Sequence, residues 1–347
     1  MSKILVTGAA GFVGYHMVKK LLAQGYEVVG FDNLNTYYSV KLKYDRLNEL
    51  GIVYHSQKNE YFNQSFDFYH GSLENKELIF SIFEKYNFDY VIHLAAQAGV
   101  RYSLENPQTY IDSNITGSLN ILEACRTYKP KHLVFASSSS VYGLNTVYPF
   151  NENHSTDHPI SLYAATKKAN EMMAHTYAHL FQLPVTGLRF FTVYGSWGRP
   201  DMAPILFAKN ILNRKPIQVF NNGEMYRDFT HVSDITESIL RLLPVSPKIN
   251  TSQNTDSLPS SESSAPYKIF NIGNNNPIKL IDFITELENA LGVEAIKEYK
   301  EIQPGDVVKT FADSSSLYKA IDFKPTTSLK DGIQEFASWF KTYHGTI

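Results

Sequence analysis

A tyrosine and a lysine stand four residues apart in the stretch SLYAATKK, residues 161–168. Side chains at this spacing lie on one face of a helix. The phenol of tyrosine is a poor base at neutral pH because its ordinary pKa is about 10, and a nearby ammonium group favours the phenolate. Tyr163 and Lys167 are therefore either an ordinary solvated pair or a base with the cation that activates it.

Four serines, residues 137–140, follow the apolar run LVFA, which predicts the end of a buried strand. Ligands of open parallel sheets bind at the carboxyl ends of the strands, so these hydroxyls could contact a ligand. The alternative is a loop whose hydroxyls bond to nearby backbone. Combined with the tyrosine and the lysine, a serine hydroxyl that bonds the reacting oxygen makes a site for hydride transfer.

The stretch TGAAGFVG, residues 7–14, follows the first apolar run and opens the first amphipathic segment. Its glycines allow the backbone to approach a pyrophosphate closely, and the start of the helix offers free N–H groups. Asp32 ends the second apolar run, where a carboxylate can bind the ribose hydroxyls of adenosine and repels a 2′-phosphate. The pattern predicts NAD binding in preference to NADP; the alternative is a tight turn without a ligand.

The elements that must position these groups alternate along the first part of the chain. Short apolar runs predict strands at 3–7, 27–31, 90–95, 132–137 and 185–191, and helical spacing of apolar residues predicts helices at 12–24, 73–86, 107–128 and 161–181. Strands and helices in this order form right-handed crossovers and a parallel sheet covered on both faces. We therefore expect an α/β fold with a Rossmann-type doubly wound parallel sheet.

The elements become shorter after residue 194. Strands are expected at 217–220, 268–272 and 307–311, and helices at 233–243, 280–291 and 329–343. These predict a smaller C-terminal α/β domain over 195–347, with some later segments returning to the first domain, residues 1–194. The stretch 246–266 is polar and rich in serine, which is typical of a flexible surface loop.

The composition limits the class of protein. The chain has 347 residues, 43% hydrophobic and 19% charged, with a formal net charge of −2, so neither nucleic acid nor a membrane surface is an expected partner. Cys125 is the single cysteine, which excludes an internal disulfide, and we expect no metal site. No apolar run approaches the roughly 20 residues that span a bilayer, and the first residues show no cleavable signal, so a cytoplasmic location is expected.

Longer stretches carry a resemblance to a known family. TGxxGxxG with YxxxK is the pattern of the extended short-chain dehydrogenases/reductases. The chain is more narrowly similar to bacterial UDP-glucuronate 4-epimerases of capsular polysaccharide pathways in HLAAQAGVRYSLENP (93–107), ASSSSVYG (136–143), SLYAATKKANEMMAHTY (161–177) and GLRFFTVYGSWGRPDM (187–202). RDFTHVSDI (227–235), YKIFNIGNNNPIKL (267–280) and QPGDV (303–307) extend the resemblance nearly to the C-terminus.

The resemblance implies a role for individual residues. Tyr163 would be the base, Lys167 its electrostatic partner and a ligand of the nicotinamide ribose, and Ser138 the hydroxyl that bonds O4 of the sugar. The cofactor contacts would be Gly8, Gly11, Phe12, Val13, Gly14, Asp32, Asn33, Asn35, Ser72, Leu73, Leu94, Ala95, Ala96, Gln97, Asn114 and Ser137. The substrate contacts would be Arg101, Ser138, Ser139, Ser140, Thr192, Arg199, Arg227 and Asp306.

The implied activity is NAD-dependent 4-epimerisation of UDP-glucuronate to UDP-galacturonate through a 4-keto intermediate, in surface polysaccharide synthesis. Residues 195–347 would mainly bind the UDP-sugar, and helices 107–128 and 161–181 would pair in a homodimer. Thr192 and the serines 138–140 would hold the substrate carboxylate, with Arg199 near it or near the pyrophosphate. The alternatives are a UDP-glucuronate decarboxylase and a 4-epimerase of another UDP-hexose. A sensor without turnover is disfavoured, because it needs no serine, tyrosine and lysine together.

Overall fold

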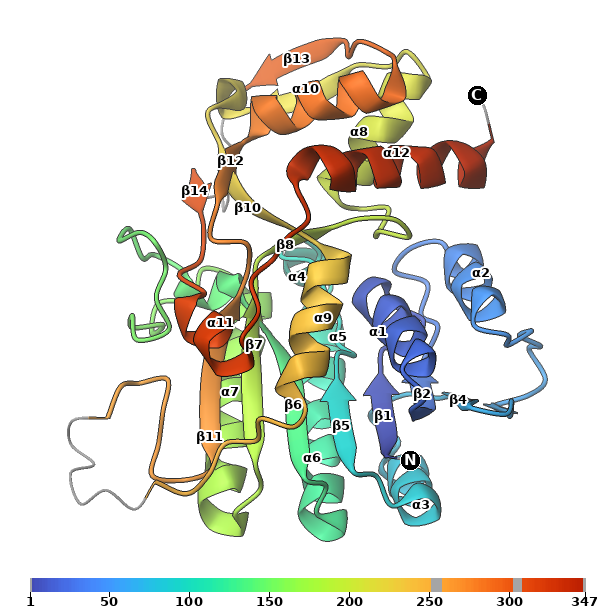
Figure 1. The fold of residues 1–347 in the computed structure, drawn as a ribbon, viewed down its shortest axis with the longest axis vertical. Coiled ribbons are helices and arrows are strands. Elements are labelled where there is room, and N and C mark those ends of the chain that lie inside the picture. The colour runs from blue at the N-terminus through green and yellow to red at the C-terminus, as the bar shows by residue number, and fades with distance from the viewer. Residues whose placement is uncertain (1, 251–257, 302–307, 346–347) are drawn as a thin grey trace.

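The computed structural model describes residues 2–250, 258–301 and 308–345. Its largest element is an eight-stranded sheet in which only the edge pair β3–β4 is antiparallel among the described strands (Figure 1). In spatial order the strands are β11 (Tyr267–Ile272), β7 (Val185–Phe190), β6 (His132–Ser138), β5 (Tyr90–His93), β1 (Lys3–Thr7), β2 (Glu27–Asp32), β4 (Phe66–His70) and β3 (Glu60–Tyr61). The predicted doubly wound parallel sheet is confirmed.

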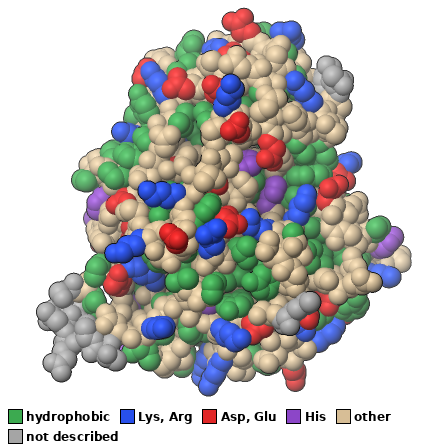
Figure 2. All heavy atoms as spheres, viewed as in Figure 1, with side chains coloured by type: hydrophobic (Ala, Val, Ile, Leu, Met, Phe, Trp, Pro, Cys, Tyr) green, Lys and Arg blue, Asp and Glu red, His purple; other side chains and the backbone are tan. Residues whose placement is uncertain are grey.

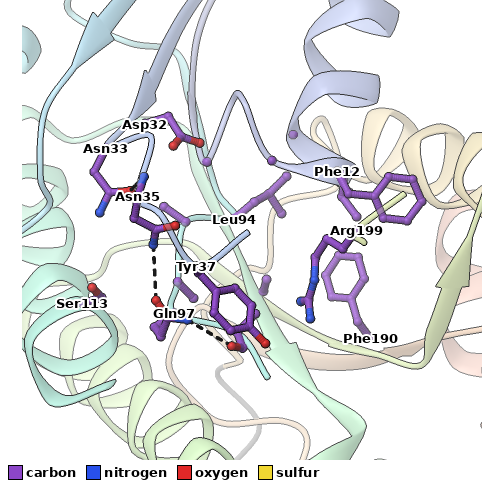
Figure 3. A pocket seen from close by; sticks show the side chains of 18 of the residues that line it. Phe12, Asp32, Asn33, Asn35, Tyr37, Leu94, Gln97, Ser113, Phe190 and Arg199 are labelled. Atoms are coloured by element: carbon purple, nitrogen blue, oxygen red, sulfur yellow. Dashed lines mark hydrogen bonds between the residues drawn. The ribbon is translucent and has the colours of Figure 1, made fainter. Parts of the chain in front are cut away.

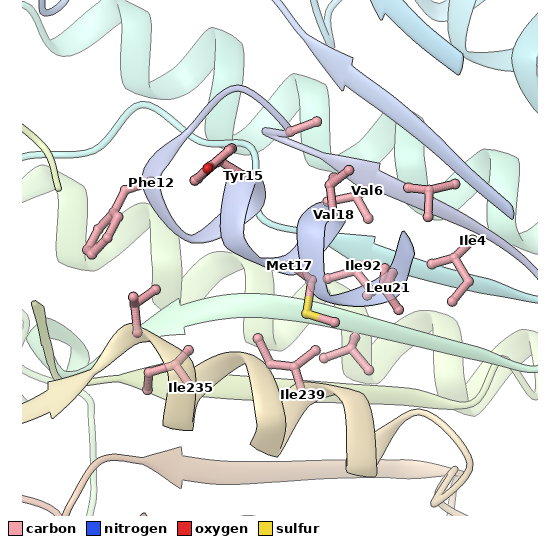
Figure 4. Close-up of a cluster of buried hydrophobic side chains, with 14 of the residues drawn as sticks. Ile4, Val6, Phe12, Tyr15, Met17, Val18, Leu21, Ile92, Ile235 and Ile239 are labelled. Carbon is pink, nitrogen blue, oxygen red and sulfur yellow. The ribbon is translucent and has the colours of Figure 1, made fainter. Parts of the chain in front are cut away.

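Alternating side chains of the strands are buried on the two faces of this sheet, as the pleat requires. In β1, Ile4 and Val6 belong to the hydrophobic core beneath α1 and α9, whereas Leu5 belongs to the core on the opposite face. Figure 4 shows the first of these cores, where Ile235 and Ile239 of α9 face the residues of α1.

The first face is covered by α1 (Phe12–Ala23), α2 (Val40–Glu49), α9 (Val232–Leu242) and α11 (Ser315–Ile321), and the second by α3 (Lys76–Tyr86), α6 (Gly117–Tyr128) and α7 (Leu162–Phe181). Thus β11, α9 and α11 follow residue 194 in sequence and still pack into the large sheet and its helices.

A smaller unit lies at the top of Figure 1. There β10 (Tyr226–His231) pairs with β8 (Thr192–Tyr194), β12 (Pro277–Lys279) and β14 (Lys309–Thr310), and β9 (Ile217–Phe220) pairs with β13 (Lys297–Lys300). The helices α8 (Ala203–Leu212), α10 (Leu280–Leu291) and α12 (Leu329–His344) enclose a separate hydrophobic core with these strands.

The helix expected at 107–128 is interrupted in the structure. It consists of α5 (Pro107–Tyr110), a π-helical segment η1 (Ile111–Thr116) and α6, preceded by the short α4 (Tyr102–Glu105). Gly117 starts α6 where an added Cβ would lie 2.5 Å from Cβ of Leu73, so this helix approaches the neighbouring segment closely. Segments with π-helical geometry are frequent at functional sites.

Several elements of the fold were not predicted, among them α2 and β10. In α2, Leu42 and Leu47 share the buried face with the charged Lys43 and Arg46, which hides the apolar period. In β10, the buried carboxylate of Asp228 accepts hydrogen bonds from three backbone N–H groups, at 2.8–3.1 Å, so a strand with charged residues is stable inside the protein.

The surface and the predicted loop complete the description. Among the described helices, none is long and apolar enough to cross a membrane. Basic and acidic side chains are interspersed on the face that Figure 2 shows.

Part of the predicted loop at 246–266, residues 251–257, lies outside the described residues. In the rest of this loop, Ser261 donates to Asn153 Oδ1 at 2.9 Å, and Ser263 bonds His175 at 2.9 Å.

Candidate active site

A cavity opens at the carboxyl ends of β1, β2, β5 and β6, where the sequence places its motifs (Figure 3). Asp32, Asn33 and Asn35 gather at one end, and Phe12 and Arg199 lie at the other (Figure 3). The predicted site residues that line it are Gly8, Gly11, Phe12, Val13, Gly14, Asp32, Asn33, Asn35, Leu73, Leu94, Ala95, Ala96, Gln97, Ser137, Ser138, Tyr163, Lys167 and Arg199.

The glycine-rich turn after β1 tolerates no other residue at two of its positions. Gly8 has a φ of +73°, and a Cβ there would lie 2.9 Å from the backbone nitrogen of Ala95. A Cβ on Gly14 would lie 1.9 Å from the carbonyl oxygen of Gly8. The turn therefore leaves bare backbone beside the cavity, as close binding of a dinucleotide pyrophosphate requires.

The acid at the end of β2 is held in place by backbone donors. Asp32 Oδ2 accepts from the N–H of Ala10 at 3.1 Å, and Oδ1 accepts from the N–H of Leu34 at 2.8 Å. The carboxylate thus joins the glycine-rich turn to the loop after β2 and keeps free lone pairs at the cavity. These acceptor oxygens fit the hydroxyl groups of the NAD ribose, which donate.

The tyrosine and the lysine of SLYAATKK lie on the first two turns of α7. Ser161 caps this helix by accepting from the N–H of Ala164 at 3.1 Å. Lys167 Nζ donates to the carbonyl oxygen of Ala136 in β6 at 2.7 Å, so the ammonium group lies at the end of that strand. Tyr163 is half-buried and faces the cavity with Ser138.

Burial shifts both groups away from their ordinary protonation behaviour. It raises the pKa of the Tyr163 phenol, while the Ser138 hydroxyl and the positive charge of Arg199 lower that pKa in part. It also lowers the pKa of Lys167 to about 8, so this ammonium remains largely charged at neutral pH. In the protein without ligands the phenol carries its proton, and added positive charge near it would favour the phenolate.

A buried ion pair lies beneath these groups, in the part of the site formed by α7, β6 and β7, which we call the floor. Arg189 of β7 donates from Nε and Nη2 to the two carboxylate oxygens of Glu171 in α7, each at 2.9 Å. Ser137 Oγ donates to the same carboxylate at 2.6 Å. Both charged side chains are at most 4% exposed. The pair thus joins α7, which carries the tyrosine and the lysine, to the strands that carry the serines.

Arg199 reaches the cavity from the loop after β8 and is held there by two residues that the sequence analysis did not assign. Its Nε donates to Asp201 Oδ1 at 3.1 Å, and the hydroxyl of Tyr37 donates to Asp201 Oδ2 at 3.0 Å. Burial raises the pKa of the Asp201 carboxyl, but Arg199 and Tyr37 outweigh burial and keep that pKa below its ordinary value. Arg199 is therefore a positive charge held at a fixed position in the wall of the cavity.

Several predicted contacts do not line the cavity. Asn114 lies behind it and braces Gln97, whose N–H donates to Asn114 Oδ1 at 2.8 Å. Thr192 belongs to β8, opposite Phe229 of β10. The others absent from its described wall are Ser72, Arg101, Ser139, Ser140 and Arg227, and Asp306 lies outside the described residues.

Other residues that line the cavity were missed, among them Tyr37, Tyr38, Lys43, Ser113 and Phe190. The stretch NTYYSVKLK, residues 35–43, carries three of them directly after the predicted cofactor acid. A loop that follows a strand at the ligand-binding edge was the available signal for these residues.

The comparisons with known proteins agree with this geometry. The model of the NAD dependent epimerase/dehydratase family matches residues 4–254. Protein CapI of Staphylococcus aureus is 53% identical over 344 residues, which are 99% of each chain. UDP-glucuronate 4-epimerase 1 of Arabidopsis thaliana is 45% identical over 99% of this chain and 77% of its own length. The structure of UDP-glucuronic acid 4-epimerase from Bacillus cereus with UDP-glucuronic acid and NAD has a TM-score of 0.82 and 32% identity, covering 98% of this chain and 99% of that chain.

The buried ion pair between Glu171 and Arg189 should contribute strongly to the free energy of unfolding. We expect Glu171→Gln to lower the free energy of unfolding by about 3–5 kcal/mol, because Arg189 then remains buried without its counter-charge. Chemical denaturation measures this change. Glu298→Gln, in an exposed pair with Lys300, is the matched control and should cost less than about 1 kcal/mol. Equal losses in the two variants would contradict the assignment.

The pKa of Tyr163 can be measured directly. The difference in phenolate absorbance between the wild-type protein and Tyr163→Phe, followed against pH, isolates this one phenol. We expect its pKa to lie above the ordinary value, and Ser138→Ala to raise it further because the hydroxyl that favours the phenolate is lost. Ser138→Thr retains a hydroxyl and should leave it close to the wild-type value. A Ser138→Ala titration identical to wild type would refute the role of this hydroxyl.

Proposed function

The chain belongs to the NAD dependent epimerase/dehydratase family, and it is an NAD-dependent UDP-sugar 4-epimerase. From this premise we propose that its substrate is UDP-glucuronate and its product UDP-galacturonate, formed through a 4-keto sugar. The observation that carries the proposal is the cation Arg199 in the wall of the same cavity that brings Tyr163 and Ser138 to the glycine-rich turn. In line with the sequence resemblance, the product would serve surface polysaccharide synthesis.

In this proposal the chain moves one proton at the sugar. Tyr163, as phenolate, takes the proton of the O4 hydroxyl and later returns it, while Ser138 bonds the same oxygen. NAD, held by the glycine-rich turn and Asp32, would supply the hydride acceptor for C4 and a positive charge that favours the phenolate. Lys167 adds a second positive charge, whose place is fixed by Ala136.

The carboxylate of a uronate needs a partner in a water-poor site, because an unpaired buried charge is costly. Arg199 is a cation in the cavity wall, oriented by Asp201 and Tyr37. We propose that it pairs with the carboxylate or with the neighbouring diphosphate. The proposed place of Thr192 beside the carboxylate has less support, since this residue does not line the cavity in the described residues.

The products of UDP-glucuronate decide between the proposal and its alternatives. We incubate the full-length protein with UDP-glucuronate, with and without added NAD, and identify products by mass and by NMR. Unchanged mass with inverted C4 is the expected result. Release of CO₂ with a UDP-pentose would identify a decarboxylase, and turnover of UDP-glucose or UDP-N-acetylglucosamine alone would identify another 4-epimerase. Tyr163→Phe, the control, should lose about 10²–10⁴-fold in rate.

We further propose that the protein forms a homodimer through α6 and α7. These helices pack together, and the Tyr177 hydroxyl of α7 donates to Glu123 of α6 at 2.5 Å. Outward-facing apolar side chains remain on them: Leu119 is 39% exposed, Met172 58% and Leu180 61%. We propose that these side chains form one patch, since contiguous exposed apolar patches mark interaction surfaces.

Sedimentation velocity tests the homodimer. The wild-type protein should sediment with twice the chain mass, and the double change Met172→Glu with Leu180→Glu should give the single-chain mass, because buried charges oppose association. Leu206→Glu, at an exposed apolar position of α8, should remain dimeric. A wild-type protein of single-chain mass, or a dimer that survives the double change, would disprove this interface.

A further inference from the structure

Arg46 of α2 is the largest side chain that the described structure buries completely. Its Nη1 donates to the carbonyl oxygen of Ala10 and to the hydroxyl of Tyr38, each at 2.8 Å. Its Nη2 donates to the carbonyl oxygen of Trp197 at 2.5 Å, with Gly198 at 3.4 Å. All these partners are uncharged oxygens.

A buried guanidinium group normally has a carboxylate partner, because an uncompensated buried charge is costly. In the described part of the chain, the side chain of Arg46 forms no ion pair, and its Nε is buried without any hydrogen-bond partner. The carbonyl oxygens that accept from Arg46 belong to loops, and carbonyl oxygens of loops can bind water instead. They therefore do not require a buried arginine. We conclude that Arg46 is not explained by stability alone.

The partners of Arg46 belong to two different walls of the cavity. Ala10 lies within the glycine-rich turn that faces the cofactor site, between Gly8 and Gly14. Trp197 and Gly198 directly precede Arg199, the cation that lines the opposite end. The two loops are separated by nearly the whole first domain in sequence, and one planar guanidinium group joins them.

Neighbouring bonds hold α2 itself in register with the cavity. Lys43, one turn before Arg46, donates from Nζ to the backbone and side-chain oxygens of Asn35, each at 2.8 Å. Residues three apart on a helix share a face, so both cations point toward the cavity walls. The helix therefore cannot shift without moving the loops after β1 and β2 together.

We propose that Arg46 is a positioning residue that couples the binding of NAD to the binding of the UDP moiety of the sugar nucleotide. Ordering of the glycine-rich turn by one ligand fixes Ala10, and through Arg46 it fixes the loop that presents Arg199 to the other. The second ligand then finds its loop already ordered and binds more tightly. Anionic phosphates bound beside either loop also offset the buried positive charge.

The inference rests on the proposed binding of NAD and a UDP-sugar, and it takes the diphosphate as the partner of Arg199, so it does not depend on the identity of the sugar. The test therefore uses UDP alone as the second ligand. The NAD dissociation constant of the full-length protein is measured by equilibrium dialysis, without UDP and at saturating UDP. For the wild-type protein we expect UDP to lower this constant about tenfold, within the usual range of coupling between sites.

Arg46→Met should bring the ratio of the two constants close to one, because neither loop is then bonded to α2. Arg46→Lys keeps the charge but replaces the planar fork by a single ammonium group, which cannot serve both loops. It should also reduce the ratio, while preserving NAD affinity without UDP better than Arg46→Met does. If Arg46→Met does not fold, as judged by circular dichroism, Arg46→Lys carries the test.

Arg241→Met is the matched control, since Arg241 is an exposed arginine of α9 that pairs with Glu237, and it should retain the wild-type ratio. A merely structural role would weaken NAD binding equally with and without UDP and leave the ratio unchanged. If both Arg46 variants keep the wild-type ratio of NAD dissociation constants, or if this ratio is one in the wild-type protein, the inference is wrong and the proposed function is unaffected. A wild-type protein that binds no NAD overturns the proposed function as well.

Discussion

The active-site geometry of this protein depends on the buried pair between Glu171 and Arg189. A hydride and a proton can be exchanged with one carbon and its oxygen only when base, hydroxyl and cofactor are held within fractions of an ångström. Tyr163, the proposed base, lies on α7, and Ser138 lies at the end of β6, so a bond between that helix and the sheet must fix their separation. The bidentate geometry of arginine and carboxylate supplies this, and Ser137 joins it from β6 itself.

The walls of the cavity are built differently from its floor. The floor consists of strands and a 20-residue helix, whereas Arg199, Asp201 and Tyr37 come from loops that follow different strands. Loops tolerate change in sequence more readily than the elements they join. The residues of the wall can therefore change while the helix and the strands that hold Tyr163 and Ser138 stay the same.

Patterns within one segment predicted many of the residues that line the cavity, but not the buried pair of Glu171 and Arg189 beneath them. The glycines before α1, the acid after β2 and the tyrosine–lysine spacing in α7 each depend on residues close in sequence, and the parallel sheet follows from alternating periods. The same reasoning failed for α2, because Lys43 and Arg46 occupy its buried face and break the apolar period. Their burial depends on carbonyl oxygens brought close by the tertiary fold, and no local pattern reveals those partners.

The predicted substrate contacts Thr192 and Arg227 stay predictions, because a motif does not give the direction of a side chain. Thr192 and Arg227 were assigned by motif, but the direction of a side chain is set by the strand that carries it. Thr192 lies in a strand paired with β10, and Arg227 Nη1 donates to the backbone oxygens of Tyr226 and Val308. A motif therefore predicts which segment approaches the ligand, while the pairing of strands and the partners of each loop determine which of its side chains reach the cavity. This is why the charged walls had to be found in the structure.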